Sequence, residues 1–306
     1  MIKIFTLLCG IVFTAFTAGA QLLTWTPDFP KDNDNISITV DASKGNQGLF
    51  NYATVSDVYV HTGVITNLST SSTDWRYVKF NQNFNQPNAQ LQATSLGANR
   101  WKFDITNIRA YYGVPAGETI QKISILFRNG AGTTVQRNAD ASDMYIPVYD
   151  NSIATRFTVP LFQPTYTRIP ETINKQVGDN INLTAIANLS STMKLFLNGT
   201  EIQTASGVTT ISANPTLTTP GNQTIRVDAI NGATTKSESF QFFVASAPTV
   251  APLPPGVRDG INYEAGNTSV VLVLYAPGKN RVSVMGEFPG SNWAEQTNYV
   301  MNKTPD

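Results

Sequence analysis

Short stretches of alternating apolar and polar residues recur along the chain, separated by residues that favour turns. Between Ile36 and Val40 the alternation is strict, which predicts a strand with one buried face. Further stretches of this kind follow at Asp57 to Thr62, Trp75 to Phe80, Arg100 to Ile105, Thr119 to Arg128 and Met144 to Val148. No convincing helical pattern interrupts them. This spacing of short strands predicts that residues 21–150 form a β-sandwich.

Residues 151–247 show the same alternation and contain no cysteine, and they resemble an immunoglobulin-like domain. Separate strands are expected at Asn180 to Ile186 and at Met193 to Leu197, among others. The dipeptide Asn198-Gly199 follows an apolar stretch and predicts a tight hairpin. Residues 248–256 are rich in proline and predict a semi-rigid extended linker.

The last segment, residues 257–306, contains too few strands for a core of its own. Val270 to Tyr275 is an apolar run, Ala276 to Asn280 favours a turn, and Arg281 to Met285 alternates again. Two strands and part of a third are marginal in water. We therefore expect a partial domain, an all-β fold of tandem β-sandwiches with the last one incomplete, and a chain that is a fragment of a longer protein.

Within this last segment, VVLVLYAPGKNRVSVMGEFPGSNW resembles the N-terminal β-sandwich of the α-amylase, isoamylase and pullulanase superfamily, glycoside hydrolase family 13. Domains of this immunoglobulin-like, E-set type are also classed as glycogen- and starch-binding modules. The match departs from the family pattern at Glu287 and in the longer stretch from Pro289 to Asn292. The resemblance implies that a catalytic (β/α)8 barrel, absent here, follows the domain.

The first unit resembles modules that precede amylase-type hydrolases in Bacteroidetes. The similar phrases are TPDFPKDNDNISITVDASKGNQGL, DVYVHTGVI, RWKFDIT and SILFRNGAGTTVQRNADASDMYIPVYD. This resemblance implies a carbohydrate-associated module without identifying the sugar.

The N-terminal residues 1–20 have the layout of a secretory signal peptide, with Lys3 ahead of an apolar run and Ala18-Gly19-Ala20 before Gln21. Cleavage near Ala20 would give a secreted or cell-surface protein. The single cysteine, Cys9, lies in this segment, so the mature chain holds no disulfide or thiolate metal site. No later apolar run is long enough to span a bilayer.

Charge and chemistry narrow the possible functions. The chain has 21 basic and 21 acidic residues, which gives no attraction for nucleic acid. The sequence shows no alternation of strands and helices of the kind that forms a catalytic barrel, so no acidic residue falls at the end of a barrel strand. We therefore assign no catalytic residue. The single histidine, His61, supports neither a triad nor a metal site, and a structural or exposed role is favoured. We predict no cofactor, no bound metal and a monomer.

Three aromatic residues are candidates for carbohydrate binding: Trp75, Tyr77 and Trp293. Trp75 follows the polar stretch Asn67 to Asp74, so it is either a sugar platform beside a loop or a core residue at a strand start. Trp293 is a candidate by resemblance alone. Trp101 alternates with Phe103 and Ile105, which favours burial.

Three hypotheses follow. The first is a non-catalytic N-terminal portion of a secreted α-amylase-type hydrolase that binds starch-like α-glucan, such as glycogen or maltooligosaccharide. The second is a non-enzymatic surface glycan-binding protein of a starch-uptake system. The third is a structural or adhesin-like array without sugar affinity, in which Trp75 and Trp293 would be buried.

Overall fold

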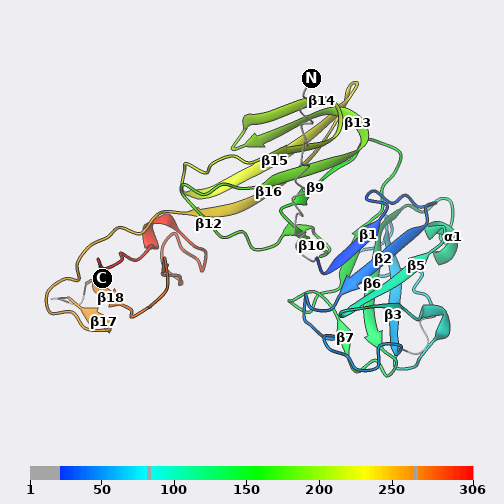
Figure 1. Cartoon of the computed structure of the whole chain (residues 1–306), viewed down its shortest axis with the longest axis horizontal. Coiled ribbons are helices and arrows are strands. Elements are labelled where there is room, and N and C mark those ends of the chain that lie inside the picture. Colours follow the sequence, from blue (N-terminus) through cyan, green and yellow to red (C-terminus); the bar gives the residue numbers. More distant parts are fainter. Residues whose placement is uncertain (1–20, 81–83, 265, 267, 306) are drawn as a thin grey trace, which may run out of the picture.

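The structure is a computed structural model that describes residues 21–80, 84–264, 266 and 268–305 (Figure 1). The predicted signal peptide lies outside the described residues. Strands dominate the described part, where the helical segments are short: η1 (Ala89–Leu91), α1 (Ile108–Tyr112) and η2 (Thr297–Tyr299). The prediction of an all-β chain of tandem immunoglobulin-like sandwiches is confirmed.

The first sandwich packs two four-stranded sheets around one core. One sheet has the order β1-β2-β5-β4, with β1 (Leu23–Thr26), β2 (Ile36–Asp41), β5 (Arg100–Ile105) and β4 (Thr94–Gly97). In the other, β6 (Ile120–Asn129) pairs with β3 (Val58–Thr66), β7 (Val135–Gln136) and β8 (Met144–Pro147). The sheet formed by β3, β6 and β8 carries the candidate site on its outer face.

The alternation in β2 matches that in β5 residue by residue. Ile36, Ile38 and Val40 lie opposite Ile105, Phe103 and Trp101, and all six are buried. Trp101 is 1% exposed, which confirms its predicted core position. The short helix α1 was not predicted. Its N-terminus is capped by the Asn107 side chain, which accepts a hydrogen bond from the Ala110 N–H, so a local cap stabilises it where periodicity gives no signal.

The second sandwich is built around one long strand, β13 (Leu183–Leu197). The first half of β13 pairs with β9 (Thr155–Val159), and its second half pairs with β15 (Gly221–Asn231). The prediction of two separate strands here was wrong. The pairing of β13 with β14 shifts its register between Ile186 and Ser191, and β13 continues through this irregularity as one strand. The remaining strands are β10 (Phe162–Gln163), β11 (Ile169–Pro170), β12 (Lys175–Gln176), β14 (Thr200–Ala213) and β16 (Thr234–Ala245).

The predicted hairpin at Asn198-Gly199 is confirmed as the turn between β13 and β14. Both residues have positive φ, 50° and 83°, as the two-residue turns that match strand twist require. The core beneath contains Phe157, which is fully buried and contacts Phe162 and Phe240.

The described residues from 257 onward contain one hairpin, β17 (Gly260–Tyr263) with β18 (Val270–Val273). Its apolar side chains are exposed, for example Tyr263 at 69% and Ile261 at 62%. The predicted strand at Arg281 to Met285 was wrong, because there Ser283 makes an isolated bridge to Val300. The predicted domain boundaries, the linker and the incompleteness of this last domain stay predictions.

The two sandwiches contact each other through the segment that joins β10 to β11, residues 162–170, called here the junction hairpin. The Tyr145 N–H of the first sandwich donates to the Pro164 carbonyl oxygen at 2.8 Å. Gln21 Nε2 donates to the Phe162 carbonyl oxygen at 2.8 Å. Outside the junction hairpin, Arg156 of β9 pairs with Asp28 of the first sandwich at 2.5 Å. These contacts set the first sandwich against the second.

The buried ring of Phe157 gives a test of the second core. Replacing a fully buried Phe with Ala leaves a cavity, so Phe157→Ala is expected to lower the free energy of unfolding by about 3–5 kcal/mol. Thr210→Ala, at an exposed position of β14, is the matched control and should change it by less than about 0.5 kcal/mol. Urea unfolding followed by circular dichroism measures both. Equal midpoints for Phe157→Ala and the unaltered protein would contradict the assigned core.

Candidate functional site

The position of Trp75 is set by a close crossing of the segment that follows it over the edge of β3. Arg76 N–H donates to the Val64 carbonyl oxygen at 2.8 Å, and Val64 N–H donates to the Arg76 carbonyl oxygen at 2.9 Å. Gly63 permits this approach, because a Cβ there would lie 3.0 Å from the Arg76 carbonyl oxygen. The predicted strand from Trp75 to Phe80 was therefore wrong. Left-handed φ at Tyr77 (51°) and Phe80 (49°) breaks the extended backbone.

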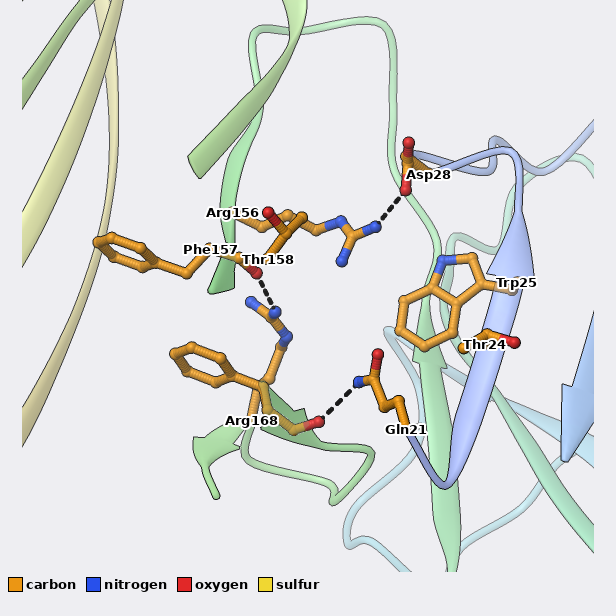
Figure 2. A pocket seen from close by; sticks show the side chains of 9 residues that line it. Gln21, Thr24, Trp25, Asp28, Arg156, Phe157, Thr158 and Arg168 are labelled. Atoms are coloured by element: carbon orange, nitrogen blue, oxygen red, sulfur yellow. Dashed lines mark hydrogen bonds and ion pairs between the residues drawn. The ribbon is translucent and has the colours of Figure 1, made fainter. Parts of the chain in front are cut away.

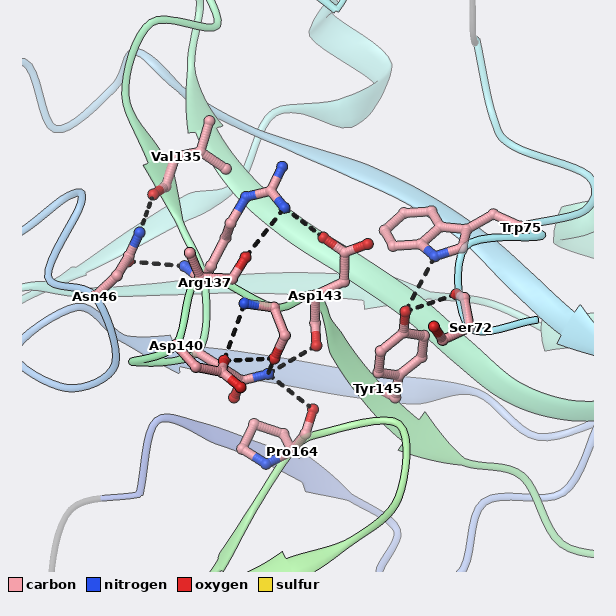
Figure 3. A network of polar contacts seen from close by, with 12 residues as sticks. Asn46, Ser72, Trp75, Val135, Arg137, Asp140, Asp143, Tyr145 and Pro164 are labelled. Carbon is pink, nitrogen blue, oxygen red and sulfur yellow. Dashed lines mark hydrogen bonds and ion pairs between the residues drawn. The ribbon is translucent and has the colours of Figure 1, made fainter. Parts of the chain in front are cut away.

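Trp75 lies half-buried over the outer face of the β3–β6–β8 sheet. Its ring stacks on His61 with centroids 5.5 Å apart and 24° between planes. Its Nε1–H donates to the Tyr145 hydroxyl at 3.4 Å, and that hydroxyl donates to the Ser72 carbonyl oxygen at 2.7 Å (Figure 3). Among the described residues no third ring contacts Trp75, so its face opposite His61 has no aromatic partner.

Aromatic contacts continue from Trp75 in both directions. Phe84 meets His61 edge to face at 5.2 Å, and Tyr145 meets Tyr166 of the junction hairpin at 5.4 Å and 84°. We call these five side chains the aromatic row: Phe84, His61, Trp75, Tyr145 and Tyr166. The row therefore runs from the first sandwich to the junction with the second.

At its junction end the aromatic row reaches a cavity of about 330 Å³ between the first sandwich and the junction hairpin. The cavity is lined by Trp25, Lys122, Tyr145, Pro147, Phe162, Gln163, Pro164, Thr165, Tyr166, Thr167 and Arg168. This lining combines aromatic rings with an amide, hydroxyls and two cations. Ligand cavities of roughly 300–1,000 Å³ with mostly apolar walls and a few polar groups bind small organic molecules.

A second cavity, of about 160 Å³, shares Trp25, Phe162 and Arg168 with the first. Figure 2 shows the guanidinium of Arg156 on one side of it and that of Arg168 on another, with Trp25 and Gln21 opposite. Arg156 is 8% exposed, and burial lowers the pKa of its guanidinium. Its charge is compensated by Asp28, and its guanidinium lies 5.3 Å from the centre of the Trp25 ring.

The other sequence-predicted residues lie in different surroundings. Tyr77 donates its hydroxyl hydrogen to Glu118, which Thr66 and Arg76 also contact. The hydrogen bond from Thr66, together with that from Tyr77, lowers the pKa of Glu118. Trp293 is 70% exposed in the C-terminal segment, which Figure 1 shows at the far end of the second sandwich from the first. Trp75 and Trp293 thus do not share one site.

Several residues of the site were not singled out by sequence reasoning, notably Tyr145, Tyr166 and Lys122. Tyr145 and Lys122 lie in predicted strands, where alternation assigns them to the face opposite the core. The signal that a ligand site lies there is the pairing of the sheet with a hairpin from the next domain, which no local pattern in the sequence reveals.

The cavity lacks the groups of a hydrolytic centre. No Asp or Glu of the described chain lines it, whereas glycoside hydrolysis uses a pair of carboxyl groups. Within the described ranges, no three His, Cys, Asp or Glu side chains are grouped so as to hold a metal ion. In the same residues, no helix has the length and apolar character needed to cross a membrane.

The fold and site define a pair of immunoglobulin-like sandwiches with an aromatic and polar cavity at their junction. No protein-family model and no curated protein matches the chain.

Three solved structures show how similar the fold is to known ones. Fibronectin(III)-like modules of Clostridium thermocellum CbhA are 17% identical, cover 30% of this chain and 98% of their own, and give a TM-score of 0.25. The D0-D1 domain of intimin is 11% identical over 72% of this chain and 97% of its own, with a TM-score of 0.35. The Bacteroides ovatus protein SGBP-B, in complex with a mixed-linkage heptasaccharide, is 10% identical over 79% of this chain and 48% of its own, with a TM-score of 0.26.

His61 makes the stability of this site depend on pH. Burial, reinforced by Arg128 and Arg137, lowers the pKa of His61 below its ordinary value of 6.5. The unfolded chain therefore binds the proton at a higher pH than the folded chain does, and stability falls as pH drops below about 6.5. Because His61 is the single histidine, His61→Phe should flatten the change in urea midpoint between about pH 7 and about pH 5.5 while keeping a ring on Trp75. An equally steep fall in the variant would contradict this assignment.

Proposed function

We propose that this protein is a non-catalytic glycan-binding array whose binding site is the aromatic row together with the 330 Å³ cavity. The observation that carries the proposal is the continuity of ring contacts from half-buried Trp75 through buried Tyr145 to half-buried Tyr166, ending among amide and hydroxyl groups. A pyranose offers an apolar face to a ring and hydroxyls to polar neighbours. Aromatic side chains with one polar end suit such a ligand, because they combine apolar contact with directed hydrogen bonds.

The ligand proposed first is a starch-like α-glucan, as the resemblance of the C-terminal segment to amylase-associated domains implies. In this proposal the chain positions the polymer for a glycoside hydrolase barrel, and the cavity itself performs no chemistry. We also propose a secreted or cell-surface location, which the signal-peptide layout of residues 1–20 supports. The alternative proposal is a non-enzymatic surface glycan-binding protein of a starch-uptake system. It uses the same binding site and differs from the first proposal in having no catalytic domain.

Retention on insoluble starch, with cellulose as the second polymer, tests the site. Trp75 and Tyr166 each contact the ring of Tyr145, and Trp75→Ala and Tyr166→Ala remove these two rings one at a time. Each is expected to weaken starch binding roughly tenfold, which corresponds to about 1.4 kcal/mol, the loss typical of an aromatic anchor. Phe50→Ala is the matched control, because Phe50 is exposed on the first sandwich and belongs neither to the aromatic row nor to the cavity lining. Trp293→Ala tests the C-terminal segment.

The outcomes separate the parts of the proposal. Binding lost in both site variants, with folding intact by circular dichroism, supports the row and cavity as one site. Binding lost only in Trp293→Ala would transfer the glycan site to the C-terminal segment. An unaltered protein that is retained on neither polymer would reject the α-glucan, and unaffected retention in both variants would reject the site.

A further inference from the structure

Lys122 is a half-buried cation in the cavity wall without an anionic partner. It lies on the outer face of β6, opposite Ile65 on one side and Pro147 on the other. Its Nζ is 4.9 Å from the centre of the Tyr166 ring. No carboxylate in the described part of the chain forms an ion pair with it, although nine other ion pairs are present there.

The charges around Lys122 make the cavity electropositive. The other cation of the lining, Arg168, pairs with Glu238 and donates to the Phe157 carbonyl oxygen at 2.6 Å. Lys122 has only the cation–π contact with Tyr166, which contributes less than an ion pair with hydrogen bonds. The half-buried ammonium therefore brings three hydrogen-bond donors to the cavity wall, and its charge has no carboxylate partner among the described residues.

We infer that the cavity binds a sugar unit carrying an anionic substituent, a carboxylate or a phosphate ester, with Lys122 as its charge partner and Tyr166 against the ring. This inference rests on the proposed glycan-binding function and specifies one feature of the ligand. Gln163 and Thr165 supply amide and hydroxyl groups for the ring hydroxyls of the same unit. A neutral sugar would fill the same space but would leave the lysine charge unpaired.

The test compares three ligands that share one pyranose ring: glucose, glucose 6-phosphate and glucuronic acid. Binding to the whole protein is followed by chemical-shift changes in two-dimensional NMR spectra at up to millimolar ligand. We expect glucuronic acid, glucose 6-phosphate or both to bind at least about tenfold more tightly than glucose, because a charged hydrogen bond contributes that much. Comparing the two acids identifies which substituent is preferred, and added sodium chloride should weaken only the acidic ligands.

In Lys122→Gln, glucuronic acid and glucose 6-phosphate should bind no more tightly than glucose binds to the same variant, and Lys122→Arg should retain the preference for the acidic ligands. Lys44→Gln removes the same charge from an exposed position of the first sandwich and should have no effect. If Lys122→Gln does not fold, the inference is still tested in the unaltered protein by the comparison of the three ligands and by the effect of salt on each.

Equal, salt-independent affinity for all three ligands, or a preference that persists in Lys122→Gln, would overturn the inference while leaving glycan binding intact. If none of the three ligands changes the spectra, retention on starch separates the two cases. Retention that depends on Trp75 and Tyr166 overturns the inference alone, and absent retention rejects the proposed function with it.

Discussion

The backbone hydrogen bond from Tyr145 to the Pro164 carbonyl oxygen is the contact on which the arrangement of the site depends. It joins an edge strand of the first sandwich to the junction hairpin of the second. Because Tyr145 also contacts Trp75 and Tyr166, this one residue aligns rings from both domains. Burial raises the pKa of the Tyr145 hydroxyl, which keeps it a neutral donor and acceptor between Trp75 and Ser72. The cavity is formed by this placement of the two sandwiches, because its lining comes from both of them.

The sequence predicted the fold class well because alternation is a local signal of strands with one buried face. Ile38 and Trp101 were assigned correctly to the core for this reason. The segment after Trp75 was assigned wrongly, since neither its crossing over Gly63 of β3 nor the left-handed φ of Tyr77 and Phe80 leaves a signal in the alternation of residues. The cavity was not predictable at all, because its walls come from residues far apart in sequence, such as Trp25, Lys122 and Tyr166.

Charge at the junction is distributed unevenly between its two cavities. Arg156 and Arg168 each have a carboxylate partner, Asp28 and Glu238, and both also lie against aromatic rings. The Arg156–Asp28 pair joins the two sandwiches and the Arg168–Glu238 pair lies within the second, so neither guanidinium lacks a carboxylate partner. Lys122 differs, since its ammonium has a ring as neighbour and no carboxylate among the described residues. The smaller cavity thus has the character of a structural joint, and the larger one has the character of a binding site.

A cavity whose walls belong to two separately packed cores responds to mechanical load differently from a cavity inside one core. A pulling force along the chain acts first on the few hydrogen bonds and ion pairs of the junction, because each sandwich is held by many strand pairings and a continuous apolar core. Separation of the sandwiches would move Tyr166 away from Tyr145 before either core unravels. Under the proposed function, tension on the chain would therefore open the cavity and release its ligand while both sandwiches stay folded.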